Sequence, residues 1–143
     1  MYVFDLDGTL SIVGDRVKHL NQDPPDWDSF YNRCGEDEPN RPILNLYNAL
    51  YGLNCTVVLT GRREDTRQQT LRWFQKYNIA RPNYLLMRPI GDTRHDVELK
   101  PELLRSVGGT PAKVRIIFED RNSVVQHWRK SGYTCLQVAE GDF

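Results

Sequence analysis

Apolar runs alternate with amphipathic segments along this chain. Short, continuous apolar runs bounded by Gly, Pro and polar residues are typical of buried strands, and apolar residues spaced three and four apart are typical of helices. The pattern predicts strands at the start of the chain and at residues 55–59, 84–87, 114–118 and 133–138. It predicts helices between them at residues 42–51, 64–77, 101–107 and 123–130.

Strands that are apolar throughout, with helices between them, favour a parallel sheet that is buried on both faces. We therefore predict an α/β fold, a Rossmann-like parallel sheet flanked by helices on both faces. A length of 143 residues with 39% hydrophobic residues suits one domain with a proper core, so we expect a single domain over residues 1–143. Ligands of such sheets bind at the carboxyl ends of the strands.

Residues 11–41 interrupt this alternation. The segment is polar and contains Pro24, Pro25, Gly35 and Pro39, which break regular structure. Only one short helix is expected within it, at residues 27–33. We expect the segment, at about residues 11–41, to form a small cap or insert within the domain.

Charge and composition narrow the class of protein. Lys and Arg together number 19, as do Asp and Glu, so any basic surface must be local. No apolar run approaches the roughly 20 residues of a membrane span, and the start lacks the pattern of a signal peptide. We therefore expect a cytoplasmic protein without membrane contact, and no protein partner is evident. The cysteines Cys34, Cys55 and Cys135 do not pair evenly, and we expect the last two to be buried thiols.

The start of the chain carries the most informative chemistry. An apolar strand runs directly into Asp5 and Asp7, and Gly8-Thr9 then turns the backbone. Where a strand breaks into a loop, two acids at this spacing can converge on one point. Two carboxylates that face each other without a cation repel, whereas Mg²⁺ is readily held by carboxylates, water and phosphate oxygens. The pattern predicts a Mg²⁺ site at this strand end.

Two further strands end in polar side chains at the same edge of the predicted sheet. Thr60-Gly61-Arg62 follows the strand at 55–59, where a hydroxyl and backbone amides can bind phosphate oxygens and Arg62 can grip a phosphate in two places. Glu119-Asp120 follows the strand at 114–118 and forms a second acidic pair. We assign Asp120 to Mg²⁺, with Glu119 either alongside it or fixing its neighbours.

These motifs, together with Lys100 before Pro101, resemble the four signatures of the haloacid dehalogenase superfamily of phosphohydrolases, and they occur in the same order. The resemblance implies that Asp5 is the nucleophile that accepts the phosphoryl group and that Asp7 is the general acid and base. It implies that Asp5 also contacts Mg²⁺, that Thr60 and Lys100 belong to the catalytic group, and that Lys100 neutralises Asp5 and the transferring phosphate. The first strand would then lie at the centre of the sheet.

The last third of the chain is similar to the phosphatase domain of phage polynucleotide kinase/phosphatase. The segments that carry this resemblance are residues 91–96, Lys100, 119–121, 128–129 and 137–143. It implies substrate-binding roles for Arg16, Arg62 and Asp96, with Arg94 as the neighbouring arginine of the motif. The kinase half is missing, because no Gly-x-x-x-x-Gly-Lys-Ser/Thr loop occurs in the sequence.

Two segments have alternative interpretations. Residues 91–96 could form a charged surface loop with an internal Arg–Asp ion pair, or could bring Arg94 to the site beside Arg88 and Arg16 to bind a flanking phosphate. The aromatic tract at residues 27–31 could stack on a base as part of the cap, or could pack onto the sheet.

The resemblance implies a Mg²⁺-dependent phosphomonoesterase that removes 3′-phosphates from polynucleotide ends through an aspartyl-phosphate intermediate. One alternative is a 5′- or 3′-nucleotidase acting on free mononucleotides, which the neutral charge balance favours because long polyanions usually meet a basic face. A second alternative is a catalytically silent nucleotide-binding module. The complete set of acids and Lys100 argues against it, because a module that only binds needs no general acid.

Overall fold

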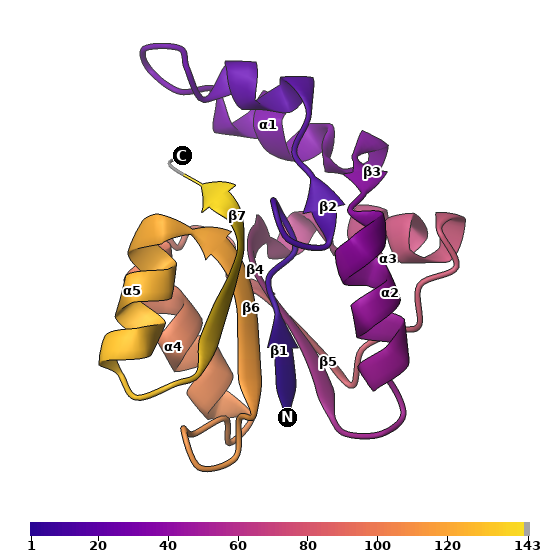
Figure 1. Ribbon diagram of the computed structural model, residues 1–143. Coiled ribbons are helices and arrows are strands. Elements are labelled where there is room, and N and C mark those ends of the chain that lie inside the picture. The colour runs from indigo at the N-terminus through magenta and orange to yellow at the C-terminus, as the bar shows by residue number, and fades with distance from the viewer. Residues whose placement is uncertain (142–143) are drawn as a thin grey trace.

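The computed structural model describes residues 1–141, and Figure 1 shows a central sheet with helices on both faces. The five strands are β1 (Tyr2–Phe4), β4 (Thr56–Arg63), β5 (Tyr84–Arg88), β6 (Ile116–Arg121) and β7 (Cys135–Gly141). All neighbouring strands are parallel, in the order β5-β4-β1-β6-β7. The predicted Rossmann-like parallel sheet is therefore confirmed, with β1 at its centre.

Two helices cover each face of the sheet. Their bounds are Arg41–Leu50 for α2, Arg67–Lys76 for α3, Asp96–Ser106 for α4 and Asn122–Lys130 for α5. Within residues 1–141, no helix combines the length and apolarity that crossing a bilayer requires.

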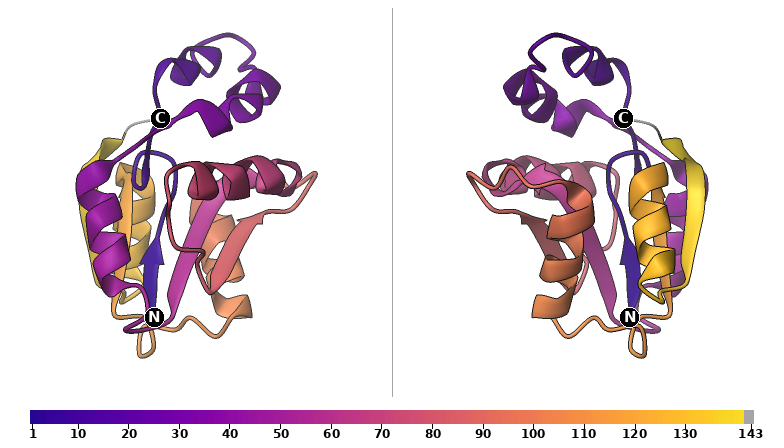
Figure 2. Two further views of the ribbon diagram at one scale, coloured as in Figure 1. Left: turned by 90° about the vertical axis from the view of Figure 1, so that its right-hand side faces the viewer. Right: turned by 90° about the vertical axis from the view of Figure 1, so that its left-hand side faces the viewer.

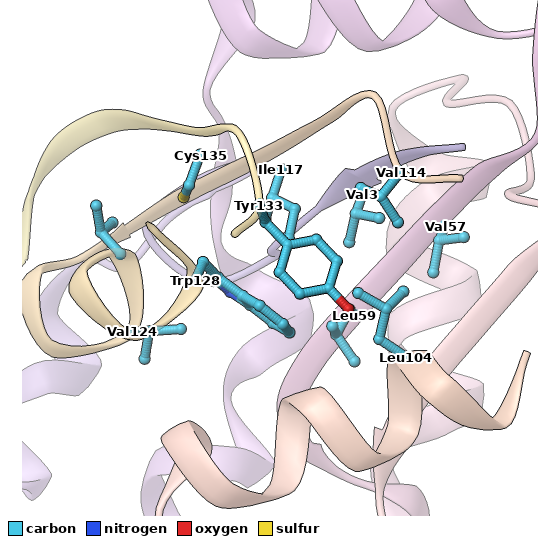
Figure 3. Close-up of a cluster of buried hydrophobic side chains, with 11 residues drawn as sticks. Val3, Val57, Leu59, Leu104, Val114, Ile117, Val124, Trp128, Tyr133 and Cys135 are labelled. Atoms are coloured by element: carbon cyan, nitrogen blue, oxygen red, sulfur yellow. The ribbon is translucent and has the colours of Figure 1, made fainter. Parts of the chain in front are cut away.

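Alternation along the strands divides the core into two clusters. Val3 faces α4 and α5, where Leu104 and Trp128 are fully buried (Figure 3). Phe4 faces α2 and α3 and stacks on Phe118, with ring centroids 4.4 Å apart. Because successive side chains of a strand point to opposite faces, the run Val3-Phe4 supplies both cores.

The cap segment, residues 11–41, lies beyond the carboxyl ends of the strands (Figures 1 and 2). It contains a two-stranded antiparallel ribbon of β2 (Ser11–Ile12) and β3 (Glu38–Pro39), the short helix α1 (Trp27–Asn32), and 3₁₀ turns at Asp15–His19 and Cys34–Glu36. The helix confirms the one expected at 27–33. The ribbon was not predicted, because strands of two residues are too short to show a period.

The largest difference from the predicted elements is α4, which begins at Asp96 and not at 101. Pro101 was expected at a helix start, where its missing N–H costs nothing. It lies inside the helix. Because proline has no N–H, the Val97 carbonyl does not receive the hydrogen bond that residue 101 would normally donate. Burial of Leu99 and Leu104 stabilises the helix across this gap.

Smaller differences lie at other ends. The segment expected as one helix at 64–77 begins with a 3₁₀ turn at Glu64–Thr66, and β4, β6 and β7 each run further than expected. The three cysteines are free thiols. Cys34 and Cys135 are buried, whereas Cys55, which was expected to be buried, is half-buried and precedes β4.

Candidate active site

The carboxyl ends of β1, β4 and β6 converge beneath the cap segment. The register of β4 on β5 shifts between Leu59 and Arg63, and that of β6 on β7 shifts between Glu119 and Arg121. Such irregularities bend a strand and re-aim its side chains. Here they occur where the predicted motifs lie. The pocket at this edge is lined by Asp5, Asp7, Trp27, Phe30, Tyr31, Thr60, Gly61, Arg88, Asp96, Lys100, Glu119, Asp120 and Arg121.

Three buried carboxylates form the centre of the pocket. Asp5, Glu119 and Asp120 each offer an oxygen within 4.8 Å of the others. Lys100 Nζ donates hydrogen bonds of 2.7 Å to Asp5 Oδ1 and to Glu119 Oε2. Burial and the neighbouring Glu119 raise the pKa of Asp5 to about 8, and burial together with Asp5 raises the pKa of Asp120 to about 6. The single positive charge of Lys100 therefore does not neutralise all three carboxylates.

The donor chemistry of this group fits Mg²⁺. The ion prefers carboxylate oxygens and tolerates only a few protein ligands, the remaining positions being taken by water and phosphate. Among residues 1–141, no Lys or Arg forms an ion pair with Asp120. Asp5, Glu119 and Asp120 are thus the residues that would hold the ion, and a divalent charge would remove the repulsion among them.

Glycines give the Asp120 carboxylate its place. A Cβ atom at Gly8 would lie 2.1 Å from Asp120 Oδ2, and one at Gly141 would lie 2.5 Å from the same oxygen. Gly8 also has a φ of +88°, a conformation that other residues rarely adopt. The loop after β1 and the end of β7 can therefore approach Asp120 only because both positions lack a side chain.

Mg²⁺ is expected to raise the melting temperature, and to do so more at pH 8 than at pH 6. A carboxyl group whose folded pKa is raised contributes stability below its unfolded pKa near 4 and loses it as the pH rises, toward about 8 for Asp5. Added Mg²⁺ relieves this growing repulsion. At 100 times its Kd the ion contributes about 2.7 kcal/mol, or roughly 5–10 °C. Thermal scans with and without Mg²⁺ measure the shift.

Asp120→Asn is the matched variant for that measurement, and it should lose most of the shift. A Mg²⁺ effect that is equal at both pH values, or unchanged in Asp120→Asn, would contradict this assignment.

Asp7 lies outside the three-acid group and binds two arginines. Its carboxylate accepts hydrogen bonds from Arg16 Nη2 and from Arg62 Nε and Nη2, the last at 2.7 Å. Burial acts to raise the pKa of Asp7, but Arg62 and Arg16 hold it well below its usual range. The sequence predicted that the Asp7 side chain would help to hold the metal; the structure directs this carboxylate to arginine instead.

The same two arginines also donate hydrogen bonds to Asp37. Arg16 donates to both Asp37 oxygens at 2.7 and 2.6 Å, and Arg62 donates to Asp37 Oδ2 at 3.0 Å. Arg62 is fully buried, so its fork faces two aspartates where the sequence predicted a phosphate. Asp37 was missed because it lies in the irregular cap segment, where no motif separates it from the other acids.

Thr60 and Gly61 lie in the pocket as predicted, and Gly61 allows Asp96 to approach. A Cβ atom at Gly61 would lie 2.8 Å from Asp96 Oδ1. Asp96 binds Arg88 and Arg121, which also line the pocket. The side-chain oxygen of Thr60 accepts the Arg62 amide at 3.1 Å, which leaves the hydroxyl proton to donate elsewhere.

Arg94 is not among the residues that line the pocket. Its side chain is 41% exposed and forms ion pairs of 2.6 Å with Asp92 and with Glu102. Residues 91–96 therefore contain the internal Arg–Asp pair that was one of the two interpretations, and of the three arginines considered there only Arg88 lines the pocket.

Arg16→Ala is expected to lower the kcat/KM of the reaction at this site roughly tenfold to 100-fold. Arg94→Ala should lower it about threefold at most. Arg16 donates one charge-assisted hydrogen bond to Asp7 and two to Asp37, of the kind that contribute roughly 1.5–3 kcal/mol each. Arg94 makes exposed pairs, which contribute little. Steady-state assays of the two variants under the same conditions measure the contrast. A larger loss for Arg94→Ala would mean that this arginine turns to the substrate.

Known proteins match this chain over most or all of its length. Residues 1–143 match the family described as "Polynucleotide kinase PNKP phosphatase domain". A bifunctional polynucleotide kinase/RNA ligase of Autographa californica nuclear polyhedrosis virus is 30% identical over 129 residues, which is 87% of this chain and 17% of that protein. The chain thus spans less than a fifth of this relative.

Solved structures also match the chain over nearly its whole length. A chain in the Pnkp1/Rnl/Hen1 complex is 32% identical, with a TM-score of 0.81 over 99% of this chain and 46% of that one. A haloacid dehalogenase hydrolase of Entamoeba histolytica HM-1:IMSS shares the fold at 14% identity, with a TM-score of 0.66 over 96% of this chain and 82% of that one.

Proposed function

Because the chain belongs to the family of polynucleotide kinase PNKP phosphatase domains, a phosphatase family with the haloacid dehalogenase fold, we propose that it removes 3′-phosphates from polynucleotide ends with the help of Mg²⁺. The observation that carries the proposal is the position of Asp5. It lies at the carboxyl end of the central strand, within the three-acid group, and its Oδ1 is 2.7 Å from Lys100 Nζ.

Asp5 is the nucleophile in this proposal. One carboxylate oxygen attacks phosphorus, the bond from phosphorus to the 3′ oxygen breaks, and the phosphoryl group is carried as an aspartyl phosphate. Water then attacks that phosphorus, which releases inorganic phosphate and restores Asp5. Lys100 neutralises the phosphoryl oxygens, and Thr60 donates its hydroxyl to one of them. Bound Mg²⁺ would offset the repulsion between the acids and an anionic substrate.

Asp7 moves the protons. Held by Arg16 and Arg62, it is ionised at neutral pH and can accept a proton from the attacking water. To protonate the departing 3′ oxygen, the carboxyl must first take up a proton. The two arginines oppose this, so a substrate phosphate that attracts either guanidinium would favour the protonated form.

Phosphate release from three substrates tests the proposal. We expect kcat/KM with Mg²⁺ to be highest for a 3′-phosphorylated oligonucleotide, lower for the matching 3′-mononucleotide and lowest for the 5′-mononucleotide. The advantage of the oligonucleotide should shrink as salt screens its backbone.

Two outcomes would favour the other candidates. Equal rates on oligomer and mononucleotide at low salt, or a preference for the 5′-mononucleotide, would indicate a nucleotidase, which the equal numbers of acidic and basic residues favour. Binding of all three substrates without any turnover would indicate a silent module.

A further inference from the structure

An aromatic side chain at the mouth of the pocket is left partly uncovered. Trp27, Phe30 and Tyr31 of α1 line the same pocket as the carboxylates, but Phe30 and Tyr31 are buried, whereas Trp27 is 47% exposed. The other two tryptophans, Trp73 and Trp128, are 1% exposed or less. An indole at a pocket mouth that the protein does not cover offers a surface for a flat, apolar ligand.

The ring of Trp27 is held in one orientation. It stacks on Tyr31, with centroids 5.9 Å apart and planes inclined by 26°, and it meets the edge of Phe30 at 6.0 Å. Asp26 caps the helix that carries all three rings, since its Oδ1 accepts the Ser29 amide at 3.0 Å. Trp27 is therefore a supported platform.

The helix is also tied to the strand that carries Thr60. The Tyr31 hydroxyl donates to the Gly61 carbonyl at 3.1 Å. Arg63, at the end of β4, lies over the Tyr31 ring at 5.1 Å and binds Asp28 at 2.7 Å. These contacts tie α1 to the strand that carries Thr60, so the indole and the acids line one pocket.

We infer that Trp27 stacks on the nucleobase of the terminal nucleotide whose 3′-phosphate enters the pocket, an inference that rests on the proposed function. A nucleotide joins a flat base to a phosphate through a sugar, which matches a pocket with an aromatic mouth and an acidic, cation-binding floor. Stacking tolerates every base because each has a π face. With no net charge on the protein, such contacts supply affinity that overall electrostatic attraction does not.

Paired substrates test the inference. One is an oligonucleotide with a 3′-terminal nucleotide phosphate, and the other has the same sequence with an abasic 3′-terminal sugar phosphate. Trp27→Ala should lower kcat/KM about fivefold to 100-fold on the first and less than about twofold on the second. Trp27→Phe should retain most of the activity on both, and the four terminal bases should differ by less than about threefold.

Tyr84→Ala is the control. Tyr84 is 42% exposed, but it is the first residue of β5, at the amino end of the strand, whereas the pocket lies at the carboxyl ends. This variant should not change either rate. Equal losses of Trp27→Ala on both substrates would show that Trp27 only supports the cap segment, and would overturn the inference.

Binding measured by fluorescence keeps the test independent of turnover and of the folding of Trp27→Ala. In Asp5→Asn, the base-bearing oligonucleotide should quench the indole emission more than the abasic one does, and Trp27→Phe in that background should remove the difference. Absence of differential quenching would overturn the stacking role. Differential quenching by a wild-type protein that releases no 3′-phosphate would instead overturn the proposed function and leave the stacking site standing.

Discussion

Asp5→Asn is expected to lower kcat on a 3′-phosphorylated oligonucleotide by at least about 10⁴-fold, the scale seen when one member of a catalytic unit is removed. The amide cannot attack phosphorus, and it cannot help to balance the charge of Mg²⁺. Phosphate release under saturating substrate and Mg²⁺ measures the loss. A variant that keeps more than about a tenth of wild-type kcat would contradict covalent catalysis by Asp5, because even a single general acid contributes more than that.

The fold of Asp5→Asn should survive. Asp5 is buried beside Glu119 and Asp120, which repel it, and Lys100 has a second partner in Glu119, 2.7 Å from its Nζ. Removing one of three like charges should leave the metal-free melting temperature at pH 8 equal to or above that of wild type. A thermal scan without Mg²⁺ therefore separates lost chemistry from lost structure.

Asp7→Asn is expected to act mainly on the leaving group. Asparagine cannot give a proton to a sugar alkoxide, so the first turnover on a 3′-phosphorylated oligonucleotide should slow by about 10²–10⁴-fold. A nitrophenolate departs without a proton, so the first turnover on nitrophenyl phosphate should slow far less. Rapid mixing at enzyme concentrations above substrate measures both rates.

The second half of the reaction gives an independent readout of the same variant. Without a base to activate water, the aspartyl phosphate on Asp5 should accumulate, and it should appear as a burst of nitrophenolate equal to the enzyme concentration. Equal slowing of the first turnover on both substrates, with no burst, would mean that Asp7 only positions Arg16 and Arg62.

Local sequence was enough to predict the sheet and the acids at its edge. The carboxyl ends of parallel strands lie at the same side of a sheet. The sequence therefore predicted that Asp5, Thr60 and Asp120, from three strands, would lie close together. The structure gathers them in one pocket. Lys100 was placed through the motif resemblance, although the helix that carries it begins five residues earlier than its proline indicated.

Tertiary structure alone decided which charged groups meet. Arg16, Arg62 and Arg94 look equally suited to phosphate in the sequence, yet the first two are buried against Asp7 and Asp37, and the third turns to Asp92 and Glu102. An ion pair depends on distance and burial between residues far apart in the chain, and no local pattern encodes these. The acids and Thr60 follow apolar runs that the local sequence shows, whereas the partner of each arginine follows only from how the cap segment packs over the sheet.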